Sequence, residues 1–170
     1  PGNVLFLPGN RIALIDFEEA RRVREAGWSG PLMLLEGFFE PRDLHTCREL
    51  QLSVVVHNEA QLLMLEAAPP GPPIGVYIKA NTGMNRLGFR TEHFADAYAR
   101  LRRVANVAPD PTLVTHLANA DDRRDTKTVA QLQAFAAATA ALQGARSIAN
   151  SAALLAWPDT RADWVRPGLV

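Results

Sequence analysis

A lysine and an arginine stand seven positions apart in the segment VYIKANTGMNRLGF, residues 76–89. An apolar run ends near Lys79, turn-forming residues follow, and Arg86 comes after the turn. A strand-end lysine can keep its charged head in water, and an arginine in a loop can cap a helix or stay on the surface. Because a bare scaffold has no need of two cations so arranged, the segment also suits a ligand site.

Three further segments place polar or flexible residues at predicted strand ends. His116 lies in VTHLANAD, Ser151 in SIANSAAL and Gly168 in RPGLV. The histidine is either a hydrogen-bonded core group or a ligand contact. The serine can cap a helix or, with free backbone N–H groups, hold an anion. The glycine lets the backbone approach a ligand closely. No second histidine or cysteine stands at ligand spacing, so we expect no metal site.

Short apolar runs alternate with helical patterns along the chain, with helices predicted at 17–27, 41–50, 59–68, 92–105, 128–142 and 152–157. Seven strand candidates lie between them, at 11–16, 31–37, 52–58, 75–81, 112–118, 146–151 and 163–170. The strands are continuous apolar runs, which is typical of parallel strands covered on both faces. The alternation predicts an α/β protein with a parallel sheet.

The polar residues favour a barrel over an open sheet. They follow the ends of many strands: Glu36, His57, Lys79, Arg86, His116, Asn150, Ser151 and Arg166. An open doubly wound sheet usually carries a Gly-rich phosphate turn after its first strand, and this sequence has none there. We therefore predict a partial (β/α)8 TIM-type barrel. A complete barrel needs roughly 200 residues or more, so we expect these 170 residues to be a piece of a longer polypeptide.

Composition excludes several classes of partner. Eighteen basic and eighteen acidic side chains balance, so no net field recruits nucleic acid or an anionic membrane. No apolar run approaches the ~20 residues of a membrane span.

Cys47 is the one cysteine of the sequence, which fits a reducing, cytoplasmic setting, and we expect it to be structural. We expect His45 and His93 to lie on exposed helix faces, and His57 to be structural.

Taken together, several segments resemble the bacterial alanine racemases, which depend on pyridoxal phosphate (PLP). The matching pieces occur in the order of the family: YIKANTGMNRLGF, THLANADD, VAQLQAF, ANSAALLAW and WVRPG. Weaker matches are LIDFEEARRVREAGW and VVVHNEAQL. The resemblance covers residues 11–170, whereas residues 1–10 do not match. It implies a PLP-binding barrel over 11–170 and a C-terminal β-domain that this sequence lacks.

The resemblance also implies a role for each site residue. Arg86 resembles the arginine near the substrate carboxylate, and Lys79 the lysine that is carbamylated in many members. His116 resembles the residue packed against the pyridine ring, and Arg166 the arginine facing the ring nitrogen. Asn150 and Ser151 resemble the asparagine-serine pair of the cofactor site, in which Ser151 would hold the phosphate together with the backbone of Gly168 and Leu169. Asn81 stands where many members have aspartate.

Two catalytic groups of the family are missing from the sequence. The lysine that binds PLP covalently lies in a KANAYGHG-type segment, which has no counterpart here, and the second base is a tyrosine of the C-terminal domain. The resemblance thus implies part of a homodimeric alanine racemase that makes D-alanine for peptidoglycan, with the chain alone inactive. Two alternatives are a non-catalytic PLP-binding barrel or degenerate remnant, and a racemase of the same fold with broader amino-acid specificity.

Overall fold

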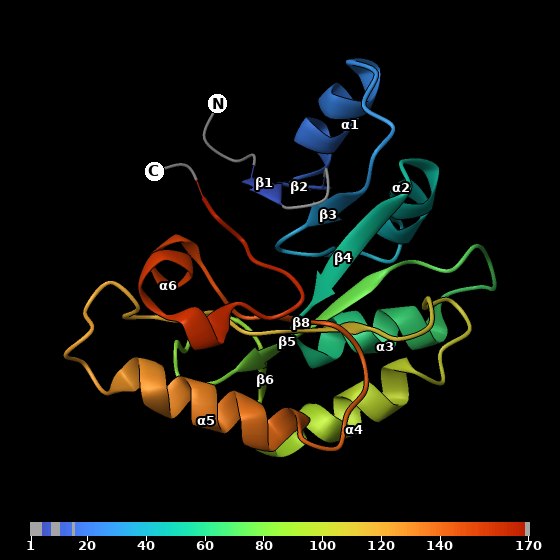
Figure 1. Ribbon diagram of the computed structural model, residues 1–170. Coiled ribbons are helices and arrows are strands. Elements are labelled where there is room, and N and C mark those ends of the chain that lie inside the picture. Colours follow the sequence, from blue (N-terminus) through green and yellow to red (C-terminus); the bar gives the residue numbers. More distant parts are fainter. Residues whose placement is uncertain (1–4, 8–10, 15, 169–170) are drawn as a thin grey trace.

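The computed structural model describes residues 5–7, 11–14 and 16–168, with side chains from Asp16 onward (Figure 1). Six parallel strands of the described chain follow one another in the sheet: β2 (Arg11–Leu14), β3 (Leu32–Leu34), β4 (Leu52–Val56), β5 (Val76–Asn81), β7 (Thr112–Val114) and β8 (Arg146–Ser147). Strand β1 (Leu5–Leu7) pairs antiparallel with β2, and β6 (Phe89–Arg90) pairs parallel with β5.

The order of the strands confirms the predicted partial barrel. A doubly wound sheet reverses its strand order at a switch point, where the chain begins to build outward in the other direction. Here β2 to β8 stay in chain order, and every crossover adds the next strand on the same side. That progression is the one that closes a (β/α)8 barrel.

The helices cover one face of the sheet. They are α1 (Phe17–Glu25), α2 (Asp43–Glu49), α3 (Glu59–Ala67), α4 (Thr91–Leu101), α5 (Lys127–Thr139) and α6 (Ser151–Ala156), followed by the 3-10 turn η1 (Pro158–Thr160). Helices α3, α4 and α5 lie side by side beneath the strands (Figure 1). The side chains of Asp16 and Asn58 accept hydrogen bonds from backbone N–H groups at the starts of α1 and α3, so both helices begin where the sequence supplies a cap.

The two faces of the sheet carry different side chains because residues alternate along a strand. In β5, Val76, Ile78 and Ala80 join the main core, which lies between the strands and the helices. The residues between them face the opposite side. There Met33 and Val55 form a second, smaller cluster, against which Leu35 and Tyr77 pack. The inner face of the barrel is therefore apolar near its base.

Several predicted boundaries were wrong. The strands predicted at 112–118 and 146–151 end at Val114 and Ser147, and the helix predicted to reach 105 ends at Leu101. Apolar residues continue beyond the ends of both strands, but their backbone groups no longer pair with the neighbouring strand. The Ala149 carbonyl, for example, accepts from the Arg166 N–H at 2.9 Å. The seventh candidate, 163–170, contributes one isolated bridge between Trp164 and Ser147 within the described residues. The short strands β1 and β6 were not predicted.

Candidate active site

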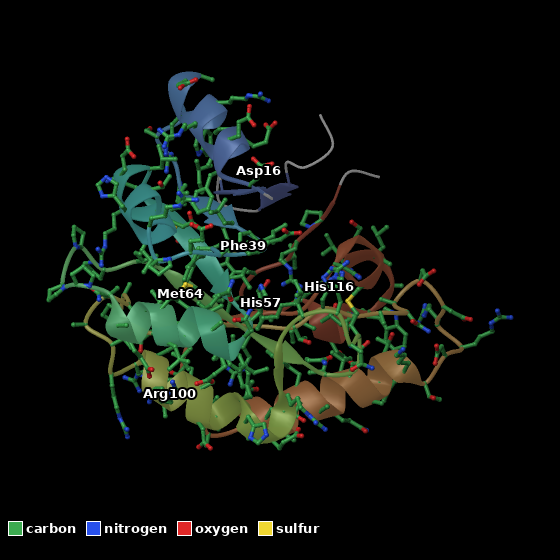
Figure 2. The ribbon with its side chains drawn as sticks, turned by 180° about the vertical axis from the view of Figure 1, so that it is seen from behind. Asp16, Phe39, His57, Met64, Arg100 and His116 are labelled. Atoms are coloured by element: carbon green, nitrogen blue, oxygen red, sulfur yellow. The ribbon has the colours of Figure 1, made fainter. Side chains whose placement is uncertain are left out.

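A cavity of about 460 Å³ opens at the carboxyl ends of the strands. Its polar lining comes from residues spread over the chain: Glu36, His57, Lys79, Arg86, Thr115, His116 and Arg166. Apolar residues complete the lining: Leu35, Phe39, Val55, Leu87 and Val114. Figure 2 shows His57 and His116 on neighbouring parts of this end of the sheet, with Phe39 beside them. The cavity lies where parallel barrels carry their active sites.

Strand alternation explains which residues reach the cavity. Lys79 lies two positions after Tyr77 in β5 and shares its inward direction, since side chains repeat every second residue. Val114 lies opposite Lys79 in the parallel register, and His116 follows it by two positions. The inner face thus presents a lysine and, one layer further along, a histidine at the ends of adjacent strands.

The cavity is rich in positive charge. Lys79 is only 8% exposed, and its pKa is lowered from 10.5 to about 8, first by burial and then by Arg86 and Arg166, with Glu36 opposing them. Burial also lowers the pKa of His116 to about 4, helped by the same two arginines and by Lys79. At neutral pH the imidazole of His116 is therefore uncharged, and Lys79 holds its proton weakly. Such a set of cations favours an anionic ligand.

Arg166 is held rigidly although it lies at the end of the described chain. Its Nη2 donates to the Thr115 carbonyl at 2.5 Å and to the Ile148 carbonyl at 3.2 Å, and its Nη1 donates to the Ser147 hydroxyl. Burial lowers the pKa of this guanidinium to about 10, which leaves it charged at neutral pH. The three bonds fix its plane against the ends of β7 and β8.

Asn150, Ser151 and Gly168 form a second group next to the cavity rather than part of its lining. The Gly168 N–H donates to Ser151 Oγ at 2.7 Å, so these two predicted phosphate contacts meet. Asn150, and not Ser151, caps helix α6, since its Oδ1 accepts from the Ala153 N–H at 3.0 Å. Of the two alternatives for Ser151, capping is therefore wrong, because the helix begins at Ser151 and the preceding residue occupies the capping position. Leu169 lies outside the described residues.

Replacing Asn150 with alanine should lower the free energy of unfolding by about 1–2 kcal/mol, because both ends of its amide are used. Its Nδ2 donates to the Leu117 carbonyl at 3.1 Å, which ties α6 to the loop after β7. Asn150→Asp keeps the capping oxygen and loses this donor, so its free energy of unfolding should fall by about half as much. Urea unfolding of the two variants checks both contributions. Equal losses in Asn150→Asp and Asn150→Ala would show that the cap contributes nothing.

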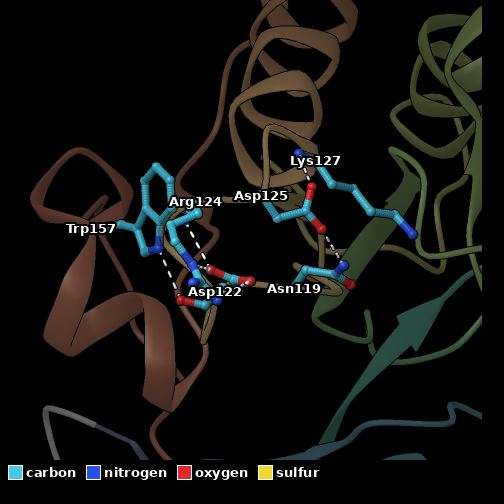
Figure 3. A network of polar contacts seen from close by, with 7 residues as sticks. Asn119, Asp122, Arg124, Asp125, Lys127 and Trp157 are labelled. Atoms are coloured by element: carbon cyan, nitrogen blue, oxygen red, sulfur yellow. Dashed lines mark hydrogen bonds and ion pairs between the residues drawn. The ribbon is translucent and has the colours of Figure 1, made fainter.

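The loop between β7 and α5 is held by local hydrogen bonds (Figure 3). Asp125 accepts from the Lys127 backbone N–H at 2.8 Å and from the Asn119 side chain. The indole N–H of Trp157 donates to the Ala120 carbonyl at 2.9 Å. His116 belongs to the start of this loop, so the fixed shape of the loop limits where the histidine can lie.

The sequence pattern of the family described as "Alanine racemase, N-terminal domain" matches residues 8–170 of this chain. The chain belongs to this family. Alanine racemases from Shewanella loihica and Paraburkholderia phytofirmans are 48% and 46% identical to it, each over 92% of the chain. The chain spans 44% and 43% of their lengths, which is less than half of each relative.

Solved structures of the family share the fold. The biosynthetic alanine racemase from Pseudomonas aeruginosa superimposes with a TM-score of 0.86 at 37% identity, covering 92% of this chain and 43% of that one. The alanine racemase from Acinetobacter baumannii gives a TM-score of 0.78 at 28% identity, with 89% and 45% covered. The partial barrel described above is thus the fold of alanine racemase N-terminal domains.

Within this alanine racemase domain, the predicted site residues divide into three sets. Four line the cavity: Lys79, Arg86, His116 and Arg166. Three lie beside it, and Leu169 lies outside the described residues. Sequence reasoning marked Glu36 and His57 as polar residues after strand ends but did not assign them to the site, although both line the cavity. Their position after a strand was the signal that could have included them.

The remaining candidate residues have ordinary surroundings. Cys47 is fully buried in the main core, and burial raises the pKa of its thiol to about 12, so it is not a nucleophile. His45 and His93 are exposed, as expected. Among the described side chains, three or more potential metal ligands of the His, Cys, Asp or Glu type do not gather anywhere. The described helices are all too short or too polar to cross a bilayer.

Proposed function

We propose that this chain forms the cofactor-binding and alanine-binding part of an alanine racemase, which interconverts L-alanine and D-alanine with PLP. One observation carries the proposal: in a chain of this family, four predicted site residues line a single cavity at the carboxyl ends of the strands. Its volume of about 460 Å³ lies in the range of small-molecule sites. The whole protein would be a cytoplasmic homodimer that supplies D-alanine for peptidoglycan.

The residues present fit the proposed cofactor. Ser151 Oγ accepts from the Gly168 N–H at 2.7 Å, so its own hydroxyl hydrogen can donate to a phosphate beside the Gly168 backbone. Arg166 keeps two N–H groups beyond the three used in its hydrogen bonds, because a guanidinium has five. His116, uncharged at neutral pH, offers a flat ring at the same end of the barrel. When bound, PLP would supply the electron sink that acidifies the α-hydrogen of alanine.

The chain's own side chains would bind and orient the substrate. Arg86 suits the carboxylate of alanine because its planar fork donates two parallel hydrogen bonds. Lys79 lies buried beside it, and its lowered pKa raises the fraction of neutral amine, which is the form that reacts with CO₂ to give a carbamate. Racemisation needs a base on each face of the α-carbon. We propose that both bases come from parts of the protein outside these 170 residues, one of them from a C-terminal β-domain.

A hybrid enzyme tests the function. Residues 16–168 replace the matched segment of the Shewanella loihica alanine racemase, which then supplies the remaining catalytic groups. We expect the hybrid to racemise alanine, and Arg86→Lys in it to lower kcat/KM at least about tenfold, since a lysine cannot hold a carboxylate bidentately. A hybrid that folds and binds PLP but leaves L-alanine unchanged would contradict the proposal. Faster racemisation of a larger amino acid would support the broader-specificity alternative instead.

The isolated chain tests the second candidate, a barrel that binds PLP without catalysis. The lack of a KANAYGHG-type segment favours this candidate for the chain by itself. We expect saturable, phosphate-sensitive binding of PLP in an absorbance titration, and no D-alanine from L-alanine. Formation of D-alanine by the pure chain would contradict the assignment of both bases to other parts of the protein.

A further inference from the structure

Gln131 is the one buried glutamine of α5, and its amide spans two loops of the candidate site. It is 1% exposed. Its Oε1 accepts from the Ala118 N–H at 2.9 Å, and its Nε2 donates to the His116 carbonyl at 3.0 Å and to Thr82 Oγ1 at 3.1 Å. The oxygen and both N–H groups of the amide are thus used, so its orientation is fixed. The side chain of Gln131 thus binds the backbone of both neighbours of Leu117, His116 and Ala118.

From Gln131 the hydrogen bonds continue through two threonine hydroxyls, and which hydroxyl donates and which accepts is fixed at each step. Thr115 Oγ1 donates to the Ala80 carbonyl at 3.1 Å, since a carbonyl can only accept. The one hydroxyl hydrogen of Thr115 is then used, so Thr82 must donate in the 2.7 Å contact between the two hydroxyls. Thr82 accepts in turn from Gln131. These bonds form a hydrogen-bond relay that runs from Gln131 through Thr82 and Thr115 to the backbone of β5.

Each end of this relay adjoins a residue that lines the cavity. The Ala80 carbonyl follows Lys79, the Thr115 carbonyl accepts from Arg166, and the His116 carbonyl accepts from Gln131 itself. Thr82 begins the turn that leads to Arg86. A buried polar network that is satisfied throughout fixes its members strongly, because any unpaired group in it would be costly.

We propose that Gln131 is a positioning residue, whose amide sets the loops after β5 and β7 so that Lys79, Arg86, His116 and Arg166 converge on the cavity. The proposal deepens the function proposed above and rests on it for the identity of the ligand. Gln131 lies behind the loops rather than among the lining residues, so it acts through backbone and hydroxyl groups. A similar arrangement of hydrogen bonds recurs on α3, where Gln61 accepts from the His57 N–H at 2.9 Å and donates to the Glu36 and Phe38 carbonyls.

The test compares Gln131→Met with Asn106→Leu in the 170-residue chain. Asn106 is a matched control because its buried amide also makes three hydrogen bonds, to Arg48, Leu65 and Ala68, far from the cavity lining. The readouts are the NMR titration of the His116 ring and the dissociation constant for PLP. In Gln131→Met we expect the pKa of His116 to rise from about 4 toward 6.5 as the ring gains water, and PLP to bind at least about tenfold more weakly. Asn106→Leu should lose stability but keep both values.

A second pair of variants covers the case in which Gln131→Met does not fold. Thr82→Val removes the central hydroxyl of the relay and keeps its shape, whereas Thr82→Ser keeps the hydroxyl. The inference requires that Thr82→Val shift the His116 titration and that Thr82→Ser restore it. If His116 titrates alike in all variants while only stability changes, Gln131 is merely structural and the inference is overturned. Failure of the unmodified chain to bind PLP would contradict the proposed function, and the NMR titration would still decide the role of Gln131.

Discussion

Replacing Lys79 with methionine should stabilise this chain by about 3 kcal/mol at pH 7. Lys79 is buried among cations, and burial together with Arg86 and Arg166 lowers its pKa from 10.5 to about 8. Each pH unit of that difference corresponds to about 1.4 kcal/mol of preference for the neutral amine in the folded chain. Methionine has a similar length, carries no charge and adapts to irregular spaces, so it removes the penalty without leaving a large cavity.

The pH dependence of unfolding isolates this contribution. Below pH 8 the lysine is protonated in both the folded and the unfolded chain, and the full penalty is present. Between pH 8 and 10.5 the unfolded chain binds more protons than the folded chain, so the stability of the unmodified chain should rise with pH through this window. Above pH 10.5 the penalty has gone. The difference between Lys79→Met and the unmodified chain should therefore shrink over the same range.

Lys127 provides the matched control, since it is the other lysine of the sequence and lies exposed on α5. Lys127→Met should change the free energy of unfolding by less than about 0.5 kcal/mol at any pH. Urea unfolding in CO₂-free buffer is the measurement, because carbamylation would replace the cation of Lys79 by an anion. An unchanged or lower stability of Lys79→Met at pH 7 would show that the cavity does not penalise the cation. A gain in stability on removal of a buried charge is typical of binding sites, whose residues are suited to the ligand rather than to the stability of the fold.

Gly37→Ala should lower the free energy of unfolding by about 4 kcal/mol. Gly37 follows Glu36 at the rim of the cavity and has φ +75°, a conformation that L-residues adopt at a cost of roughly 1–2 kcal/mol. A Cβ there would also lie 2.2 Å from the Val55 carbonyl oxygen and 2.6 Å from Gln61 Nε2. The carbonyl belongs to the central strand β4 and cannot move away cheaply, so the steric clash adds to the backbone strain.

Gly27 separates the two causes. It has φ +91°, but a Cβ built on it meets nothing within 4 Å. Gly27→Ala should therefore lose only the conformational contribution, roughly 1–2 kcal/mol. Thermal and urea unfolding of both variants measure the difference. Similar losses at the two positions would mean that the loop after β3 yields to the added methyl group, and that its close contact with β4 does not hold the rim of the cavity.

Sequence patterns were sufficient for the alternation of the main strands and helices and for the residues that line much of the cavity. Short apolar runs between helical segments predicted the parallel strands, because such strands are covered on both faces. Polar residues directly after those runs predicted the cavity, because the carboxyl ends of parallel strands meet at one end of a barrel. The quoted motifs carried the resemblance to alanine racemases, and the family match over residues 8–170 confirms it.

Only the tertiary structure decided which side each residue faces and which polar groups meet. A continuous apolar run carries no period-two signal, so Val55 and Tyr77 could not be assigned to the inner face from the sequence. The ends of β7 and β8 depended on where the neighbouring backbone stops pairing, which is a long-range property. The relay from Gln131 to Thr82 and Thr115 joins three elements far apart in the sequence, and local propensity carries no information about such contacts. Local sequence thus determined which side chains stand at the ends of the strands. Packing between distant segments determined how those side chains are oriented and hydrogen-bonded.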